Sequence, residues 1–83
     1  MTRDEIYLAL TVIFHDVFDD PRIKLFDAMT AKDLAGWDSL NHINLIIAVE
    51  QKYKIRFNTT EVARLANVGE FIDAILRKSM PPS

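Results

Sequence analysis

The chain has 83 residues and a net charge of −2, from 10 Lys and Arg residues against 12 Asp and Glu residues. We expect one domain, residues 1–83, with a modest core, because a chain this short buries only about 60 to 65% of its unfolded surface. Its ends, residues 1–5 and 79–83, are expected to fray. Scattered basic residues and the absence of cysteine argue against a nucleic-acid-binding face, a disulfide framework and a zinc–thiolate site. With neither a signal peptide nor the ~18 apolar residues of a membrane span, we expect a cytoplasmic monomer without a metal.

The first predicted helix covers about residues 2–18. Thr2 and Glu5 have the spacing of a capping box. The apolar residues that follow at helical spacing are Ile6, Leu10, Ile13, Phe14 and Val17. The sequence Asp19-Asp20-Pro21 ends this helix, because proline disfavours helical geometry in the residue before it.

A long connection, roughly residues 19–38, comes next. Loops beyond about 12 to 15 residues are unusual in small domains and tend to be functional or disordered. This one contains apolar residues that can hold it against a core, namely Ile23, Leu25, Phe26, Met29 and Leu34. We therefore expect an ordered loop with a helical turn near residues 30–34.

The second predicted helix runs from about Ser39 to Tyr53, after the segment Gly36-Trp37-Asp38. Asp38 and Ser39 are both good helix-start residues. Free N–H groups and the positive end of the helix dipole gather at such a start, so an anionic group attached to Ser39 would be stabilised there. On spacing alone, simple capping is the commoner role for such residues, and the two roles are compatible.

The second helix is apolar on more than one side, because Leu40 and Ile43 are followed by an unbroken apolar run from 45 to 49. Leu40 and Ile47 are candidates for a surface that partner proteins contact, with core burial as the alternative. The residues expected in the core, with contact to a carried group as the alternative, are Ile43, Ile46, Val49, Leu65, Val68 and Phe71.

Two further helices are predicted. Thr59 or Thr60 can cap a third helix of barely two turns that ends near Leu65. Asn67 then opens a last helix, with Glu70 three positions later. Its apolar stripe consists of Val68, Phe71, Ile72, Ile75 and Leu76. The predicted fold class is all-α, a small four-helix bundle of three longer helices and one short one with a long ordered first loop.

Taken together, the long loop, the Gly-Trp-Asp-Ser-Leu helix start, the short third helix and the amphipathic last helix resemble the acyl carrier protein family, which includes peptidyl carrier domains. The likeness covers about residues 6–76, and its specific part is Asp38-Ser39-Leu40, which resembles the family's attachment site. The resemblance implies that Ser39 carries 4′-phosphopantetheine from coenzyme A, attached by a phosphopantetheinyl transferase, with Asp38 and Leu40 beside it. It also implies that the arm carries an acyl or aminoacyl thioester, supplied by a loading ligase and used by pathway enzymes.

A hydrolase is a poor alternative, and we assign no catalytic residue. The start of one predicted helix brings together Asp38, Ser39 and His42. Residues i and i+3 of a helix project side by side, and this geometry does not suit a proton relay. His42 is a candidate for contact with the phosphodiester or a partner, and an exposed histidine without a special task is the simpler alternative. Arg64 is a further candidate for partner contact.

The second helix departs from carriers of fatty acid synthesis, which typically have several acidic residues there. Between residues 39 and 53 only Glu50 is acidic, against Lys52. Since complementary charge sets partner choice and association rate, we predict a discrete carrier for a dedicated pathway, such as secondary-metabolite, cell-surface or modified-lipid synthesis, rather than housekeeping fatty acid synthesis. Two alternatives stay open: an aminoacyl or peptidyl carrier, and a helical interaction module without a prosthetic group.

Overall fold

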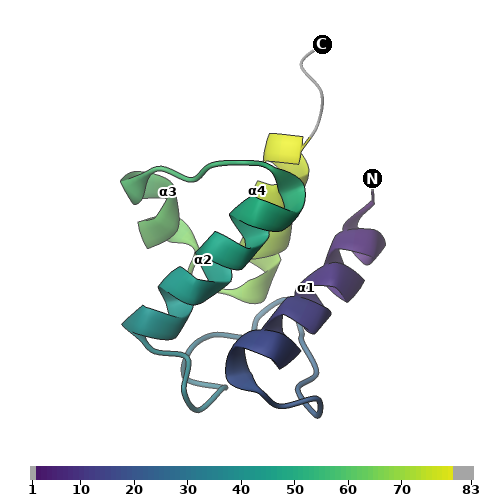
Figure 1. Cartoon of the computed structure of the whole chain (residues 1–83), viewed down its shortest axis with the longest axis vertical. Coiled ribbons are helices and arrows are strands. Elements are labelled where there is room, and N and C mark those ends of the chain that lie inside the picture. The colour runs from purple at the N-terminus through teal and green to yellow at the C-terminus, as the bar shows by residue number, and fades with distance from the viewer. Residues whose placement is uncertain (1, 80–83) are drawn as a thin grey trace.

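The computed structural model describes residues 2–79. A short polar side chain caps the start of each helix in it. The helices are α1 (Arg3–Phe18), α2 (Ser39–Tyr53), α3 (Thr59–Arg64) and α4 (Val68–Ser79) (Figure 1). Thr2, Asp38 and Asn58 each accept the backbone N–H three residues ahead, and Asn67 does the same for Glu70 at 2.8 Å. These bonds satisfy N–H groups that have no acceptor within the helix. The predicted all-α fold with three longer helices and one short one is confirmed.

One predicted helix cap needs correction. The predicted cap of α3 at Thr59 or Thr60 is wrong, because Asn58 and Glu61 already form a capping box that draws both threonines into the helix. Of the residues expected to fray, 1–5 and 79–83, Thr2 caps α1, residues 3–5 form its first turn, and Ser79 ends α4. Met1 and residues 80–83 lie outside the described residues. Within 2–79, no helix combines the length and apolarity needed to cross a bilayer.

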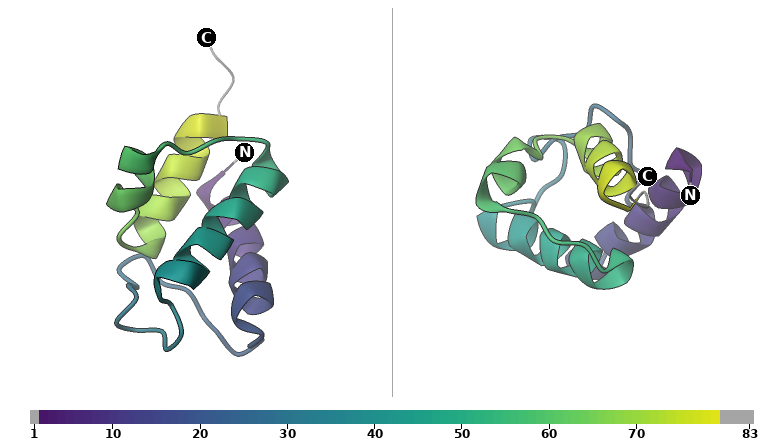
Figure 2. Two further views of the ribbon diagram at one scale, coloured as in Figure 1. Left: turned by 60° about the vertical axis from the view of Figure 1, so that its left-hand side comes forward. Right: turned by 90° about the horizontal axis from the view of Figure 1, so that it is seen from above.

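The core lies where α1, α2 and α4 pack against one another (Figures 1 and 2). Its largest fully buried side chains are Phe14, Phe71, Ile6, Leu10, Leu45, Ile72, Ile75, Val49 and Val68. Burial of one such side chain contributes about 1.5–3 kcal/mol, so these residues dominate the stability of the bundle. Helix α3 has no fully buried residue of its own; the partly buried Val62 packs against the core, and the C-terminal cap, Leu65, is buried in it.

The connection over residues 19–38 is ordered, as predicted, and lies at the lower end of the molecule in Figure 1. Its buried side chains are Ile23, Leu25, Met29 and Trp37. The carbonyl oxygens of Asp27 and Met29 accept from the N–H groups of Gly69 and Val68 at 2.9 and 3.0 Å. Gly69 permits this approach, since a Cβ atom there would lie 3.1 Å from the Asp27 oxygen. The loop thereby satisfies the start of α4 and holds the turn before α2 in place.

An ion pair joins the short helix α3 to α4. The Glu61 carboxylate lies 2.7 Å from Lys78 Nζ, and its other oxygen accepts from the Asn58 N–H at 3.0 Å. The bonds from Lys78 and from the Asn58 backbone hold the pKa of Glu61 below its usual 4.5. A carboxyl with a lowered pKa stabilises the folded state above its unfolded pKa, and this contribution is lost as the pH falls through the folded pKa.

The Glu61→Gln variant is therefore expected to melt at a lower temperature than the wild type at pH 7. Below about pH 4.5 the difference between the two melting temperatures should shrink, because the wild-type carboxyl is then being protonated too. Thermal unfolding followed by circular dichroism from pH 7 to pH 3 measures this. Asp16→Asn, at an exposed position on α1, is the control. A difference in melting temperature between Glu61→Gln and the wild type that stays constant down to pH 3 contradicts the prediction.

Candidate functional site

Hydrogen bonds hold the turn that leads into α2. Gly36 has a φ of +92°, a conformation that residues with a side chain rarely adopt. Its carbonyl oxygen accepts from the Asp38 N–H at 2.9 Å and from Asn41 Nδ2 at 2.7 Å. The Trp37 N–H donates to the Leu34 carbonyl oxygen at 3.2 Å. These bonds set Asp38 at the cap and Ser39 at the first position of α2.

Ser39 is exposed at the start of α2, and the predicted helix start at Asp38-Ser39 is confirmed. Asp38 does the capping: its Oδ1 accepts from the Asn41 N–H at 2.9 Å, and its carbonyl oxygen accepts from the His42 N–H at 2.8 Å. The N–H groups of Ser39 and Leu40 have no acceptor inside the helix. The site thus combines a hydroxyl that the cap does not use with two N–H groups at the positive end of the helix dipole.

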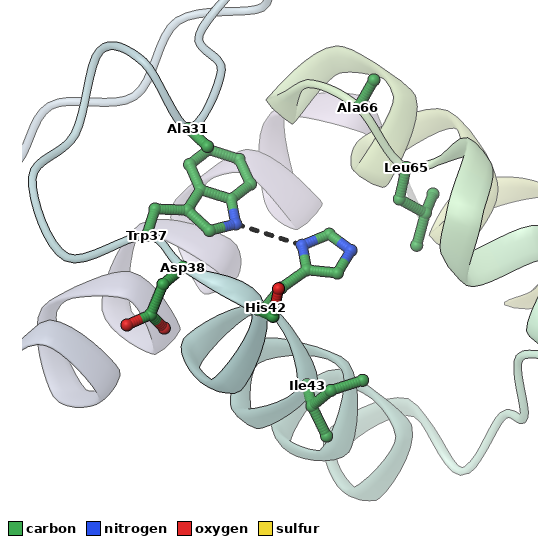
Figure 3. Close-up of a pocket in the computed structure, with 8 residues that line it drawn as sticks. Ala31, Trp37, Asp38, His42, Ile43, Leu65 and Ala66 are labelled. Carbon is green, nitrogen blue, oxygen red and sulfur yellow. Dashed lines mark hydrogen bonds between the residues drawn. The ribbon is translucent and has the colours of Figure 1, made fainter.

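A pocket of about 470 Å³ opens beside Ser39. Figure 3 shows Trp37 and His42 on one side of it and Leu65 and Ala66, from the segment between α3 and α4, on the other. Its lining residues are Ala31, Trp37, Asp38, Ser39, His42, Ile43, Leu65 and Ala66. Most of these side chains are apolar, so a group attached to Ser39 has an apolar surface within immediate reach.

Trp37 and His42 form a hydrogen-bonded aromatic pair in this pocket (Figure 3). Trp37 Nε1 donates to His42 Nδ1 at 3.1 Å, and the rings stack with centroids 6.1 Å apart. Since Nδ1 accepts, this bond assigns the neutral tautomer with its proton on Nε2, which faces the Val62 carbonyl oxygen at 3.4 Å. The expectation of an exposed histidine is wrong: His42 is half-buried because it packs between Trp37 and Phe71.

The same bonds explain why His42 does not serve Ser39 as a base. Its Nδ1 is occupied by Trp37, and its Nε2 faces the Val62 carbonyl oxygen. A serine nucleophile needs a ring nitrogen within hydrogen-bond reach of its hydroxyl, with an acid orienting the other nitrogen. The geometry at Ser39 therefore suits the attachment of a group better than hydrolysis.

The residues predicted for the core divide into two groups. Ile46, Val49, Val68 and Phe71 are buried between the helices, as predicted, and Leu65 is buried while also lining the pocket. Ile43 is a correction, because it is 46% exposed at the rim of the pocket. The rotation of α2 that turns Leu45, Ile46 and Val49 inward carries Ile43 to the outer face.

An exposed apolar strip runs along α2, formed by Leu40, Ile43 and Ile47, which are 70%, 46% and 45% exposed. We call it the α2 strip. Glu50, the one acidic residue of this helix, uses its Oε2 to accept from the Phe57 N–H at 2.8 Å. Arg64 is exposed on α3. Helix α2 therefore exposes an apolar strip, and its single carboxylate is engaged within the fold.

Sequence reasoning missed Trp37, Ala31 and Ala66 as pocket residues. Trp37 figured only as part of the motif around Ser39, and no helical periodicity relates it to His42, because it precedes the helix. Ala31 and Ala66 come from two separate connecting segments. No local signal predicts that such segments meet, since their approach depends on how the helices pack.

The known proteins that resemble this chain in sequence or in structure come from one family. No family model matches the chain. The acyl carrier protein of Acidothermus cellulolyticus is 28% identical over 75 residues, which cover 90% of this chain and 89% of that protein. The acyl carrier protein of Buchnera aphidicola subsp. Acyrthosiphon pisum is 29% identical over 68 residues, covering 82% and 85%. The solution structure of a holo acyl carrier protein from Geobacter metallireducens is 46% identical with a TM-score of 0.82, covering 87% of this chain and 83% of that one. In sequence and in fold, the chain belongs to the acyl carrier protein family.

Proposed function

We propose that the chain is a single carrier domain that holds acyl groups as thioesters on a 4′-phosphopantetheine arm attached to Ser39. Acyl carrier proteins are carriers and not enzymes, and their family implies a covalently bound phosphopantetheine group. The observation that carries the choice of residue is the exposed Ser39 hydroxyl at the first position of α2, beside a cap that does not need it.

The residues around Ser39 suit this group. The hydroxyl can be esterified without breaking the Asp38 cap, and the N–H groups of Ser39 and Leu40 stabilise the negative charge of a phosphodiester. When bound, the arm supplies a thiol, which a chain without cysteine lacks. Asp38 keeps the helix start rigid, and the exposed Leu40 offers an apolar contact to the transferase that installs the arm.

Mass spectrometry tests the proposal on the intact apo protein, incubated with coenzyme A, magnesium and a broad-specificity phosphopantetheinyl transferase. One added phosphopantetheinyl mass is expected, on the peptide that contains Ser39. In this transfer the Ser39 oxygen bonds to the phosphorus of the arm, and adenosine 3′,5′-bisphosphate leaves. A folded protein that gains no mass with several transferases would favour the alternative of a helical interaction module.

The scarcity of acidic side chains on α2 supports a dedicated pathway rather than housekeeping fatty acid synthesis. By the family resemblance, carriers of fatty acid synthesis present acidic residues of this helix to basic patches on their enzymes. Here the exposed Asn44 and Gln51 stand where acidic residues would be usual, and the carboxylate of Glu50 is bonded to the Phe57 N–H. We infer cytoplasmic partner enzymes with an apolar contact surface, and an acidic group opposite Arg64. His42, turned inward, is left out of this surface.

Housekeeping fatty-acid enzymes are expected to use the holo protein poorly. Electrostatic steering raises association rates about 10- to 1,000-fold, so we expect kcat/KM at low salt to be at least about tenfold below that of an acidic carrier. Steady-state kinetics with both carriers measure this. The double variant Asn44→Glu and Gln51→Glu, at exposed positions of α2, should recover part of the rate. Equal rates for the wild type and the acidic carrier contradict the proposal.

A further inference from the structure

We propose that the Trp37–His42 pair closes the interior of the bundle to the carried group, so that this carrier serves short acyl groups held in the pocket beside Ser39. The inference rests on the proposed function of Ser39. It concerns where the carried group lies and which lengths of acyl group the carrier serves.

The pair forms the wall of the pocket that faces the core rings of Phe14 and Phe71. Trp37 and His42 line the pocket, whereas Phe14 and Phe71 are not among its lining residues and are fully buried. Phe14 and Trp37 meet edge to face with ring centroids 5.3 Å apart, and His42 meets Phe71 at 5.6 Å. A chain that left the pocket for the core on this side would have to part these four rings.

Hydrogen bonds keep the pair closed. Trp37 is 6% exposed, and its Nε1–H donates to His42 Nδ1 at 3.1 Å. The other ring nitrogen of His42 faces the Val62 carbonyl oxygen at 3.4 Å, which ties the pair to α3. Parting the rings would strand the indole N–H in apolar surroundings, and a buried donor without an acceptor is strongly unfavourable. The closed pair is therefore the stable arrangement.

The pocket itself offers only limited burial. On the side away from the pair, its apolar walls are Ala31, Ile43, Leu65 and Ala66, of which Ile43 is 46% exposed. A short acyl group can cover these walls. The further methylenes of a long chain would stay in water if the bundle interior is closed, and each methylene that did reach the core would add stability. The dependence of stability on chain length therefore reports whether the interior is open.

The test uses the protein carrying acetyl-, hexanoyl- or decanoyl-phosphopantetheine, made with a transferase from the corresponding acyl-coenzyme A. The mass of each sample is measured first, then its melting temperature by circular dichroism and the fluorescence of Trp37, the single tryptophan. We expect the hexanoyl and decanoyl forms to melt within about 1 °C of each other, with unchanged emission, because the methylenes beyond the pocket stay in water. A melting temperature that rises steadily with chain length, or an emission shift with decanoyl, overturns the inference.

Variants make the test specific to the pair. His42→Ala removes one ring of the barrier, and its decanoyl form is expected to melt about 4 °C or more above its own acetyl form. Trp37→Phe, which keeps a ring but loses the N–H, should show the same trend more weakly. Phe18→Ala is the matched control, because Phe18 packs on Phe14 but is not part of the pocket lining. It should lower every melting temperature without adding a dependence on chain length.

The two proposals fail in different ways. A folded protein that gains no acyl-phosphopantetheine mass overturns the function of Ser39, and this inference with it. A fully loaded protein whose stability rises with chain length leaves the carrier function in place and overturns only the closed interior. Loaded His42→Ala that stays insensitive to chain length shows that the pair is not the barrier.

Discussion

Ser39→Ala is expected to take up no phosphopantetheine while keeping the stability of the wild type. The hydroxyl is the atom to be esterified, so its removal eliminates the reaction rather than slowing it. The fold does not depend on it, because Asp38 provides the cap and Ser39 is exposed. Alanine is also a better helix former than serine, so the free energy of unfolding should change by no more than about 0.5 kcal/mol.

The measurement is intact mass after incubation with coenzyme A and transferase, beside a thermal unfolding curve of the same sample. Ser79→Ala, at the other serine among residues 2–79, is the control and should be modified as fully as the wild type. The unfolding curve separates loss of the attachment atom from loss of structure. Phosphopantetheine found on Ser39→Ala would place the attachment on another hydroxyl and contradict the assignment of Ser39 as the attachment residue.

Phe71→Ala is expected to cost about 3–5 kcal/mol of the free energy of unfolding, the range for a large aromatic side chain removed from a core. Phe71 is fully buried, and its ring meets those of Trp37 and His42. The loss is severe for a chain this small, since stabilities of about 0.05–0.15 kcal/mol per residue imply only about 4–12 kcal/mol in all. A fall of some 12 to 40 °C in melting temperature follows, at about 4–8 °C per kcal/mol.

Phe26→Ala removes the same atoms from a side chain that is 48% exposed on the loop, and its expected effect is below about 1 kcal/mol. Urea unfolding followed by circular dichroism gives both free energies. The slope of free energy against urea should be alike in the two variants if each unfolds in one step. Equal losses at the two positions would contradict the burial that distinguishes them.

Local sequence signals predicted the helices and the start of α2 at Ser39 well. Thr2, Asp38 and Asn67 cap their helices as their spacing indicated, and the apolar stripe of α4 packs inward. Capping and helical periodicity involve residues within about one or two turns of each other, so a sequence displays them directly. The exposed Ser39 at the start of α2 follows from the same local rules and from the family motif around it.

The prediction that Ile43 lies in the core was wrong, and the ambiguous apolar pattern of α2 is the cause. The unbroken apolar run of α2 left the buried side undetermined, because a helix that is apolar all round has no preferred face. Packing against α1 and α4 chose Leu45, Ile46 and Val49, and it left Ile43 in the exposed strip.

By itself, then, the sequence determined four helices, the caps of three of them and a serine at a helix start, because these depend on neighbours along the chain. Only the tertiary structure decided that His42 turns inward to Trp37, that Glu50 is bonded to Phe57, and that a pocket forms beside Ser39. The two hydrogen bonds join residues five and seven positions apart across the ends of α2, and the pocket needs the meeting of two distant segments. Such contacts between distant parts of the chain carry no periodic signal in it.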